Sequence, residues 1–155
     1  MQNPPMHIHR AWTGLPASAR GATVAMGNFD GIHRGHRAVL DAARAARPDA
    51  PLGVVTFEPH PRQFFQPDAP PFRLMNAEAR ANRLARLQVQ HLYELPFDAV
   101  LAGLSPEDFA RDVLAQGLGV RHVTVKSAAR RGRGDLTVWA PREVARGDLD
   151  ALFVT

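Results

Sequence analysis

Residues 27–36 restrict the possible folds of this chain more than any other stretch. Before them, residues 22–26 are apolar and partly β-branched, as in a short buried strand. After them, residues 35–47 repeat apolar side chains at helical spacing. The stretch therefore predicts a tight connection from a buried strand into a helix, which is a building unit of α/β proteins.

The same connection suits a nucleotide phosphate. Glycines let the backbone turn tightly and come close to a ligand, and the N–H groups that begin a helix form an anion site. His33 and His36 lie at the helix entry, so one helical turn can direct both imidazoles at one triphosphate. There they would stabilise charge on the reacting phosphates. A turn of this kind can also hold Gly, Asn and Asp for conformational reasons alone, with both histidines at the surface.

The order Gly-Asn-Phe-Asp-Gly-Ile-His-Arg-Gly-His resembles the signature of the nucleotidyltransferases that carry His-x-Gly-His. The form with Asn-Phe-Asp-Gly resembles the adenylyltransferase part of bacterial bifunctional riboflavin kinase/FMN adenylyltransferases. The resemblance implies an α/β, Rossmann-like nucleotidyltransferase fold with a mainly parallel sheet flanked by helices. It also implies that ATP and FMN react to FAD and pyrophosphate, with Mg²⁺ bridging the phosphates.

The same resemblance assigns roles to individual residues. Catalysis would rest on His33 and His36. The ATP contacts that it implies are Gly27, Asn28, Phe29, Asp30, Gly31, His33, Gly35 and His36.

A second apolar run, residues 52–57, predicts another buried strand, parallel to the first. It leads into a segment whose alternating prolines, Pro59 and Pro61, are expected to keep the chain extended beside aromatic residues. The residues alone fit either a stiff loop or a rigid wall for a flat ring. The family has a similar Thr-Phe-x-Pro-His-Pro-x-x-Phe-Phe stretch at its isoalloxazine pocket. The FMN contacts that the resemblance implies are Phe57, Pro59, Pro61, Phe65 and, from a later helix, Phe109.

Later elements follow from capping and periodicity. Asn76 predicts the start of a helix that runs to about residue 88 and turns its arginines to solvent. Further on, the sequence predicts a strand at residues 91–94, a helix that starts at Ser105 and buries Phe109, and a last strand at residues 119–125.

His7 and His9 alternate in a short strand expected within residues 7–12, and they could be proposed as metal ligands. A pair of histidines on an edge strand is more often structural or exposed to solvent. We therefore predict no metal site.

The C-terminal part departs from the family pattern. Where members carry Gly-x-x-Phe-x-Phe-Gly after the last strand, this chain has Lys126, Ala129 and Arg131 at the first glycine and the two aromatic positions. Each lost aromatic contact removes on the order of 0.5–1.5 kcal/mol, so FMN should bind weakly. The Ile-Ser-Ser-Thr-x-x-Arg motif that holds the triphosphate is also missing, and Thr137 and Arg142 are its nearest counterparts. Slow or absent FAD formation is therefore expected.

Length and composition limit the remaining possibilities. With 155 residues, 45% of them hydrophobic, the chain should form one domain over 1–155. That domain would be an incomplete FMN adenylyltransferase-like one, without a riboflavin kinase domain. The formal net charge of +4 comes with many arginines, and we expect no nucleic-acid partner. Cysteine is absent and no apolar run reaches membrane-spanning length, which favours a cytoplasmic protein without membrane contact.

Two other functions stay open. An enzyme that transfers a nucleotide to a different phosphorylated small molecule would keep the same ATP turn. A remnant that binds nucleotide without catalysis would keep the core alone. The sequence leaves the oligomeric state open.

Overall fold

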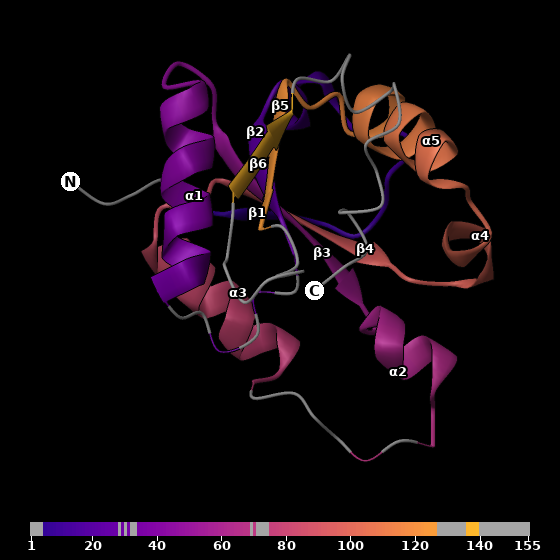
Figure 1. Ribbon diagram of the computed structural model, residues 1–155. Coiled ribbons are helices and arrows are strands. Elements are labelled where there is room, and N and C mark those ends of the chain that lie inside the picture. Colours follow the sequence, from indigo (N-terminus) through magenta and orange to yellow (C-terminus); the bar gives the residue numbers. More distant parts are fainter. Residues whose placement is uncertain are drawn as a thin grey trace.

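The computed structural model describes residues 5–27, 29, 31, 34–68, 70, 75–126 and 136–139. Within these residues, one sheet runs in the strand order β1-β4-β3-β2-β5-β6 (Figure 1). Its first five strands are parallel to their neighbours, and β6 is antiparallel to β5. The strands are β1 His7–His9, β2 Thr23–Met26, β3 Leu52–Glu58, β4 His91–Pro96, β5 His122–Lys126 and β6 Leu136–Trp139.

Helices connect the strands. The π-helix η2 follows α5 directly, so the two form one continuous helical segment. The helices are η1 Ala17–Ala19, α1 Arg34–Ala46, α2 Pro61–Phe65, α3 Ala77–Arg86, α4 Ala99–Ala102, α5 Pro106–Asp108 and η2 Phe109–Gly117.

Alternation along the strands divides the core between the two faces of the sheet. On β2, Ala25 packs with residues of α1 and α3, whereas Val24 and Met26 pack with residues of η2. Successive strand residues point to opposite faces, so the same strands feed two separate cores. Figure 1 shows the resulting layers, with α1 and α3 on one side of the sheet and α4 and α5 on the other. The sheet is thus mainly parallel and flanked by helices, as the sequence predicts.

The predicted elements are confirmed with small changes in their ends. The Asn76 side chain accepts a hydrogen bond from the backbone N–H of Ala79 at 2.8 Å, and Ser105 Oγ accepts one from Asp108 N–H at 3.1 Å. The helix after Asn76 ends at Arg86, earlier than predicted, and β4 extends to Pro96.

Two local predictions are wrong. The segment after Pro59 is not extended throughout, because α2 begins at Pro61. Proline fits the first position of a helix, where its missing N–H would have no intrahelical partner. The arginines of α3 do not all face solvent either, since Arg80 is buried. No helix among the described residues is long and apolar enough to cross a membrane.

Candidate active site

The predicted phosphate turn lies where a parallel strand ends and a helix begins. β2 ends at Met26 and α1 starts at Arg34. The N–H of Gly27 donates to Val55 O of the adjacent strand at 3.1 Å, which fixes the first residue after β2 to β3. In open parallel sheets, the crevice beyond the carboxyl ends of the strands is the usual place for a ligand.

Phe29 anchors this turn in the core. Its side chain is 1% exposed and packs in the cluster that includes Ala25, Val39 and Leu40. Its φ of 53° lies in the left-handed region, which residues other than glycine rarely adopt, and Gly31 has a φ of 78°. Because the Phe29 side chain is buried, this residue can offer a ligand only its backbone.

His36 lies in the first turn of α1. The imidazole is half-buried, and its centroid lies 4.9 Å from that of the Phe29 ring. Gly35 beside it is also half-buried. The buried Phe29 ring thus supports one of the two predicted histidines at the start of the helix. His33, Asn28 and Asp30 lie outside the described residues.

The predicted FMN contacts lie around the carboxyl end of β3, and burial divides them into two groups. Phe57 and Phe109 are core residues whose ring centroids lie 6.0 Å apart. Pro59 is exposed and Pro61 is half-buried, and the Glu58–Pro59 peptide bond is cis. Phe65 is 65% exposed. The first pair can therefore support a wall from behind, whereas the others reach solvent.

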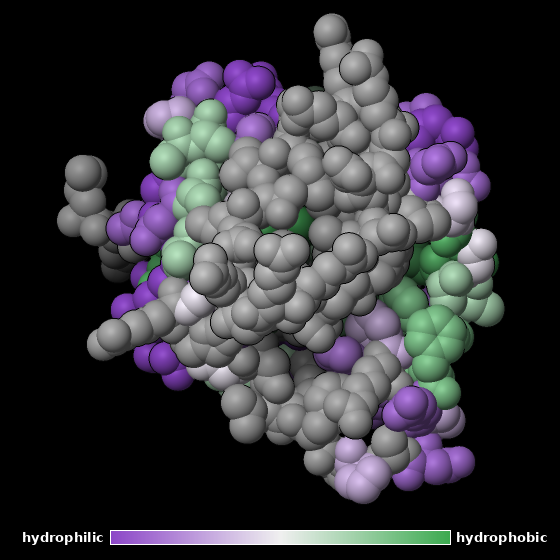
Figure 2. Space-filling model, in the orientation of Figure 1, coloured by the Kyte–Doolittle hydropathy of each residue, from purple (hydrophilic) through white to green (hydrophobic). Residues whose placement is uncertain are grey.

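Aromatic packing holds the exposed Phe65 in place. Its ring contacts Phe64 and Phe97 edge-on, with centroid distances of 5.3 Å and 5.8 Å. Figure 2 shows hydrophobic residues gathered on the side where Figure 1 places α2 and α4, and Val100 of α4 is also exposed there. Phe65 and Val100 are thus exposed hydrophobic side chains on this side of the molecule.

Sequence reasoning missed a group of charged residues beside the site. Arg80 of α3 donates to Glu58 Oε2 at 3.0 Å and lies 3.6 Å from Glu94 Oε2. Arg10 Nε donates to Glu94 Oε1 at 3.4 Å. Helical periodicity gives no sign of these pairs, because the carboxylates lie on separate strands.

The histidines of β1 gain a third partner on β4. His9 Nε2 and His91 Nδ1 are within hydrogen-bond distance at 3.0 Å, and the rings of His7, His9 and His91 stack. Burial, and then the neighbouring histidines, lower the pKa of His9 and of His91. No group of three or more His, Cys, Asp or Glu among the described residues could hold a metal ion.

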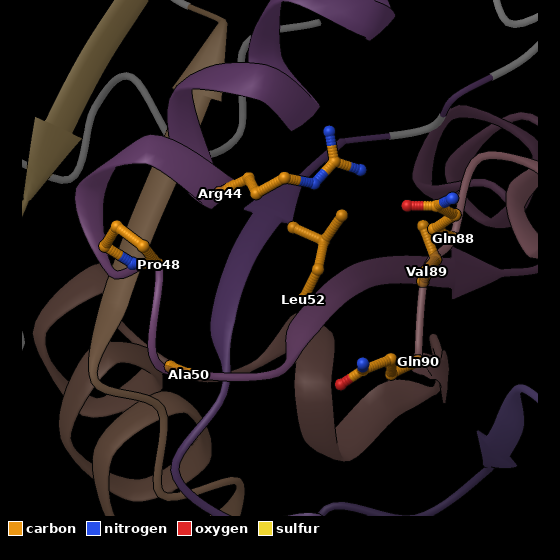
Figure 3. A pocket seen from close by; sticks show the side chains of 7 residues that line it. All are labelled: Arg44, Pro48, Ala50, Leu52, Gln88, Val89 and Gln90. Carbon is orange, nitrogen blue, oxygen red and sulfur yellow. The ribbon is translucent and has the colours of Figure 1, made fainter. Parts of the chain in front are cut away.

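A separate cavity of about 240 Å³ lies at the amino-terminal end of β3, opposite the end where the predicted flavin contacts lie (Figure 3). Arg44, Leu52, Gln88 and Gln90 are among its lining residues. The Arg44 guanidinium donates to Asp41 Oδ1 and to Leu87 O, both at 3.0 Å. This cavity is therefore remote from the predicted phosphate turn.

The late candidate residues are only partly described. The backbone of Thr137 lies in β6, opposite Val125 of β5. Arg142 lies outside the described residues, as do Ala129 and Arg131. The predicted loss of aromatic surface there stays a prediction.

Comparison with known proteins decides the family. The family model for FAD synthetase matches residues 15–138, which include the phosphate turn, β2 to β5 and the helices between them. The chain belongs to the FAD synthetase family. FAD synthetases are nucleotidyltransferases, so the resemblance found in the sequence is confirmed.

Relatives of this FAD synthetase family member include larger proteins. A bifunctional riboflavin kinase/FMN adenylyltransferase of Pseudomonas fluorescens is 39% identical over 122 residues, covering 77% of this chain and 39% of its own length. The protein of that name in Escherichia coli K12 is 34% identical over 120 residues, covering 76% of this chain and 38% of its own length. The chain thus spans about two fifths of the length of these relatives.

A solved structure supports the nucleotidyltransferase-like fold. It is that of a protein named as a macrolide-efflux protein, from Streptococcus pneumoniae, and it aligns with a TM-score of 0.60 at 25% sequence identity. The match covers 75% of this FAD synthetase family chain and 38% of the solved one.

Proposed function

We propose that this chain carries the FMN adenylyltransferase reaction, in which ATP and FMN give FAD and pyrophosphate. The observation that carries the proposal is the arrangement at the carboxyl ends of two adjacent parallel strands. The predicted phosphate turn follows β2, and the proline and phenylalanine segment follows β3. A nucleotide bound at the first and a flavin at the second would meet at one edge of the sheet.

This reaction requires the protein mainly to position the two substrates and to neutralise the charge on their phosphates. A phosphate oxygen of FMN attacks the α-phosphorus of ATP, forming the new P–O bond, and the bond to the β-phosphate oxygen breaks to release pyrophosphate. No side chain needs to become covalently attached. His33 and His36 would donate hydrogen bonds to the phosphates and stabilise their growing charge, while the glycines of the turn admit the nucleotide closely.

Mg²⁺ fits this scheme as part of the substrate. The described residues offer no cluster of carboxylates and histidines that could form a metal cage. The ATP phosphates can carry the ion themselves, as is usual for Mg²⁺ bound with nucleotides. We therefore propose that the ion enters as the magnesium complex of ATP, and that the partners of this chain are small molecules.

The flavin side would combine the exposed and buried groups. Phe65, Pro59 and Pro61 would face the isoalloxazine ring, while Phe57 and Phe109 would support them from the core. In the family pattern the positions of Lys126, Ala129 and Arg131 carry a glycine and two aromatic residues, so we propose that FMN binds weakly and FAD forms slowly.

The test follows FAD by chromatography with ATP, FMN and magnesium. The His36→Ala variant should form FAD about 10²–10³ times more slowly than the unmodified chain, because a charge-stabilising donor is lost. Arg47→Ala, an exposed arginine just beyond the other end of α1, is the matched control and should leave the rate unchanged.

Three other outcomes separate the alternatives. A rate that His36→Ala leaves unchanged would remove the histidine from catalysis. ATP binding with no FAD, but turnover of another phosphorylated acceptor, would favour the related transferase. ATP binding without turnover of any acceptor would favour the non-catalytic remnant.

A further inference from the structure

Glu58 ends β3 and points away from the predicted flavin wall. Phe57 packs on Phe109 in the aromatic core. Successive strand residues face opposite sides of a sheet, so the Glu58 side chain faces α1 and α3. There its Oε2 accepts a hydrogen bond from Arg80 Nη2 at 3.0 Å. Glu58 is therefore connected to residues 59–65, on the predicted flavin side, through the backbone.

Arg80 is a buried ion-pair partner of that carboxylate. Its side chain is 3% exposed, whereas the Glu58 side chain is 31% exposed. A buried guanidinium needs partners in fixed directions, and its planar fork suits carboxylates. The second carboxylate is that of Glu94 on β4, at 3.6 Å. Arg80 is thus tied to two neighbouring strands and joins the end of β3 to α3.

The backbone of Glu58 is also held. Its carbonyl accepts a hydrogen bond from Phe97 N–H at 3.1 Å, one residue beyond β4. Two residues after Glu58, the carbonyl of His60 accepts a hydrogen bond from Phe64 N–H at 3.0 Å. Phe64 and Phe65 then pack on Phe97. The position of residues 59–65 therefore depends on where β3 ends.

We propose that Arg80 is a positioning residue that acts through Glu58. It fixes the end of β3 so that residues 59–65 present their proline and phenylalanine side chains to the flavin. It touches neither substrate, and it serves the acceptor side rather than the ATP side. This inference rests on the proposed FMN adenylyltransferase function.

The closing experiment compares two variants, each of which removes one of the two negative charges that face the Arg80 guanidinium. Glu58→Gln changes the carboxylate at the end of β3, and Glu94→Gln changes the one within β4. For each, equilibrium titration measures the affinities for FMN and for ATP with magnesium. Glu58→Gln should weaken FMN binding about tenfold to a hundredfold, since small misplacements are costly, and leave ATP binding unchanged. Glu94→Gln should lower the thermal midpoint and leave both affinities unchanged.

Arg80→Lys gives an independent check. Lysine keeps the charge but lacks the fork that joins both carboxylates. We expect a folded protein with weaker FMN binding and unchanged ATP binding. Equal losses for FMN and ATP in Arg80→Lys or Glu58→Gln, or equal FMN losses in the Glu58 and Glu94 variants, would mean that the ion pairs serve stability alone and would overturn the proposal.

Hydrogen exchange of two backbone amides separates this inference from the proposed function. If the unmodified chain binds no FMN, the proposed function fails. The amides of Phe64 and Phe97 still report on positioning. Their exchange should accelerate in Glu58→Gln and not in Glu94→Gln, and identical exchange in both variants would refute the role of Arg80.

Discussion

The two faces of the sheet bury different chemistry. The face under α1 and α3 combines an apolar cluster with several buried polar groups, whereas the face under α4, α5 and η2 holds most of the buried aromatic side chains. The polar set is Thr23, Thr56, Arg80, Glu94 and Thr124, and the aromatic set is Phe57, Tyr93, Phe97 and Phe109. One set of parallel strands can therefore support a phosphate turn beside its polar face and a flavin surface beside its aromatic face. Side-chain alternation along the strands places the polar set and the aromatic set on opposite faces of the sheet.

The largest expected effect comes from emptying the aromatic face. Phe109→Ala should lower the free energy of unfolding by about 3–5 kcal/mol, because it leaves a cavity at a residue that is 1% exposed. Phe65→Ala changes the same type of side chain at an exposed position and should alter stability by less than about 0.5 kcal/mol. Urea denaturation of both variants measures the difference.

The same pair of variants tests the flavin surface. Phe65→Ala should weaken FMN binding despite its small effect on stability. Should Phe65→Ala destabilise the protein as much as Phe109→Ala, the description of Phe65 as an exposed surface residue would be wrong. If it left FMN binding intact, the proposed contact would be wrong.

A smaller effect should appear on acidification, at the edge of the aromatic face. His91 lies two residues before Tyr93 on β4 and stacks on it, and it shares a hydrogen bond with His9. Burial, and then neighbouring histidines, hold the pKa of both His9 and His91 below the ordinary 6.5. As the pH falls through 6.5, the unfolded chain gains protons that the folded chain does not accept. Stability should therefore be complete above that pH and decline below it.

Thermal midpoints measured from about pH 8 to about pH 5, a range that spans the ordinary histidine pKa, check this dependence. His9→Gln should flatten the decline, because it removes one of the titrating groups and a neighbour of the other. A midpoint that rises on acidification would contradict the assignment.

Local sequence predicts elements on both faces of the sheet. The strands β2 and β3, the helix α1 and the caps at Asn76 and Ser105 depend on neighbours within a few residues, and the sequence predicted them all. The family signature depends on contiguous residues as well. Local pattern therefore sufficed for the layers of the fold and for the position of the turn.

Sequence reasoning failed where partners come from distant strands. Arg80 is indistinguishable from the other arginines of its helix until Glu58 and Glu94 are placed beside it. His91 joins His7 and His9 only because β1 pairs with β4. The start of α2 at Pro61 was missed for another reason, since proline fits both an extended segment and the first turn of a helix.

The smallest expected effect lies on the polar face, and it can have either sign. Thr23 and Thr124 are both fully buried there. Thr23 Oγ1 donates to Ala43 O of α1 at 2.7 Å, whereas Thr124 Oγ1 has no hydrogen-bond partner among the described residues. Thr23→Val should cost about 0.5–1.5 kcal/mol, the usual worth of a hydrogen bond. Thr124→Val should stabilise the protein by about 1 kcal/mol, because an unpaired buried hydroxyl is removed.

Denaturation curves of the two valine variants decide whether the polar face tolerates an unpaired group. Opposite signs would show that the unpaired Thr124 hydroxyl lowers the stability of the protein. Packing does not account for this loss, since valine has the same shape and suits a strand equally well. ATP titration of Thr124→Val then tests whether this destabilising hydroxyl contributes to ATP binding. Weaker ATP binding in a more stable protein would tie the hydroxyl to the nucleotide, because Thr124 pairs with β2 two residues before the phosphate turn. Equal destabilisation by both substitutions would instead mean that Thr124 has a partner within the folded chain, and Thr56 Oγ1 would then remain a buried hydroxyl of the polar face without a hydrogen-bond partner among the described residues.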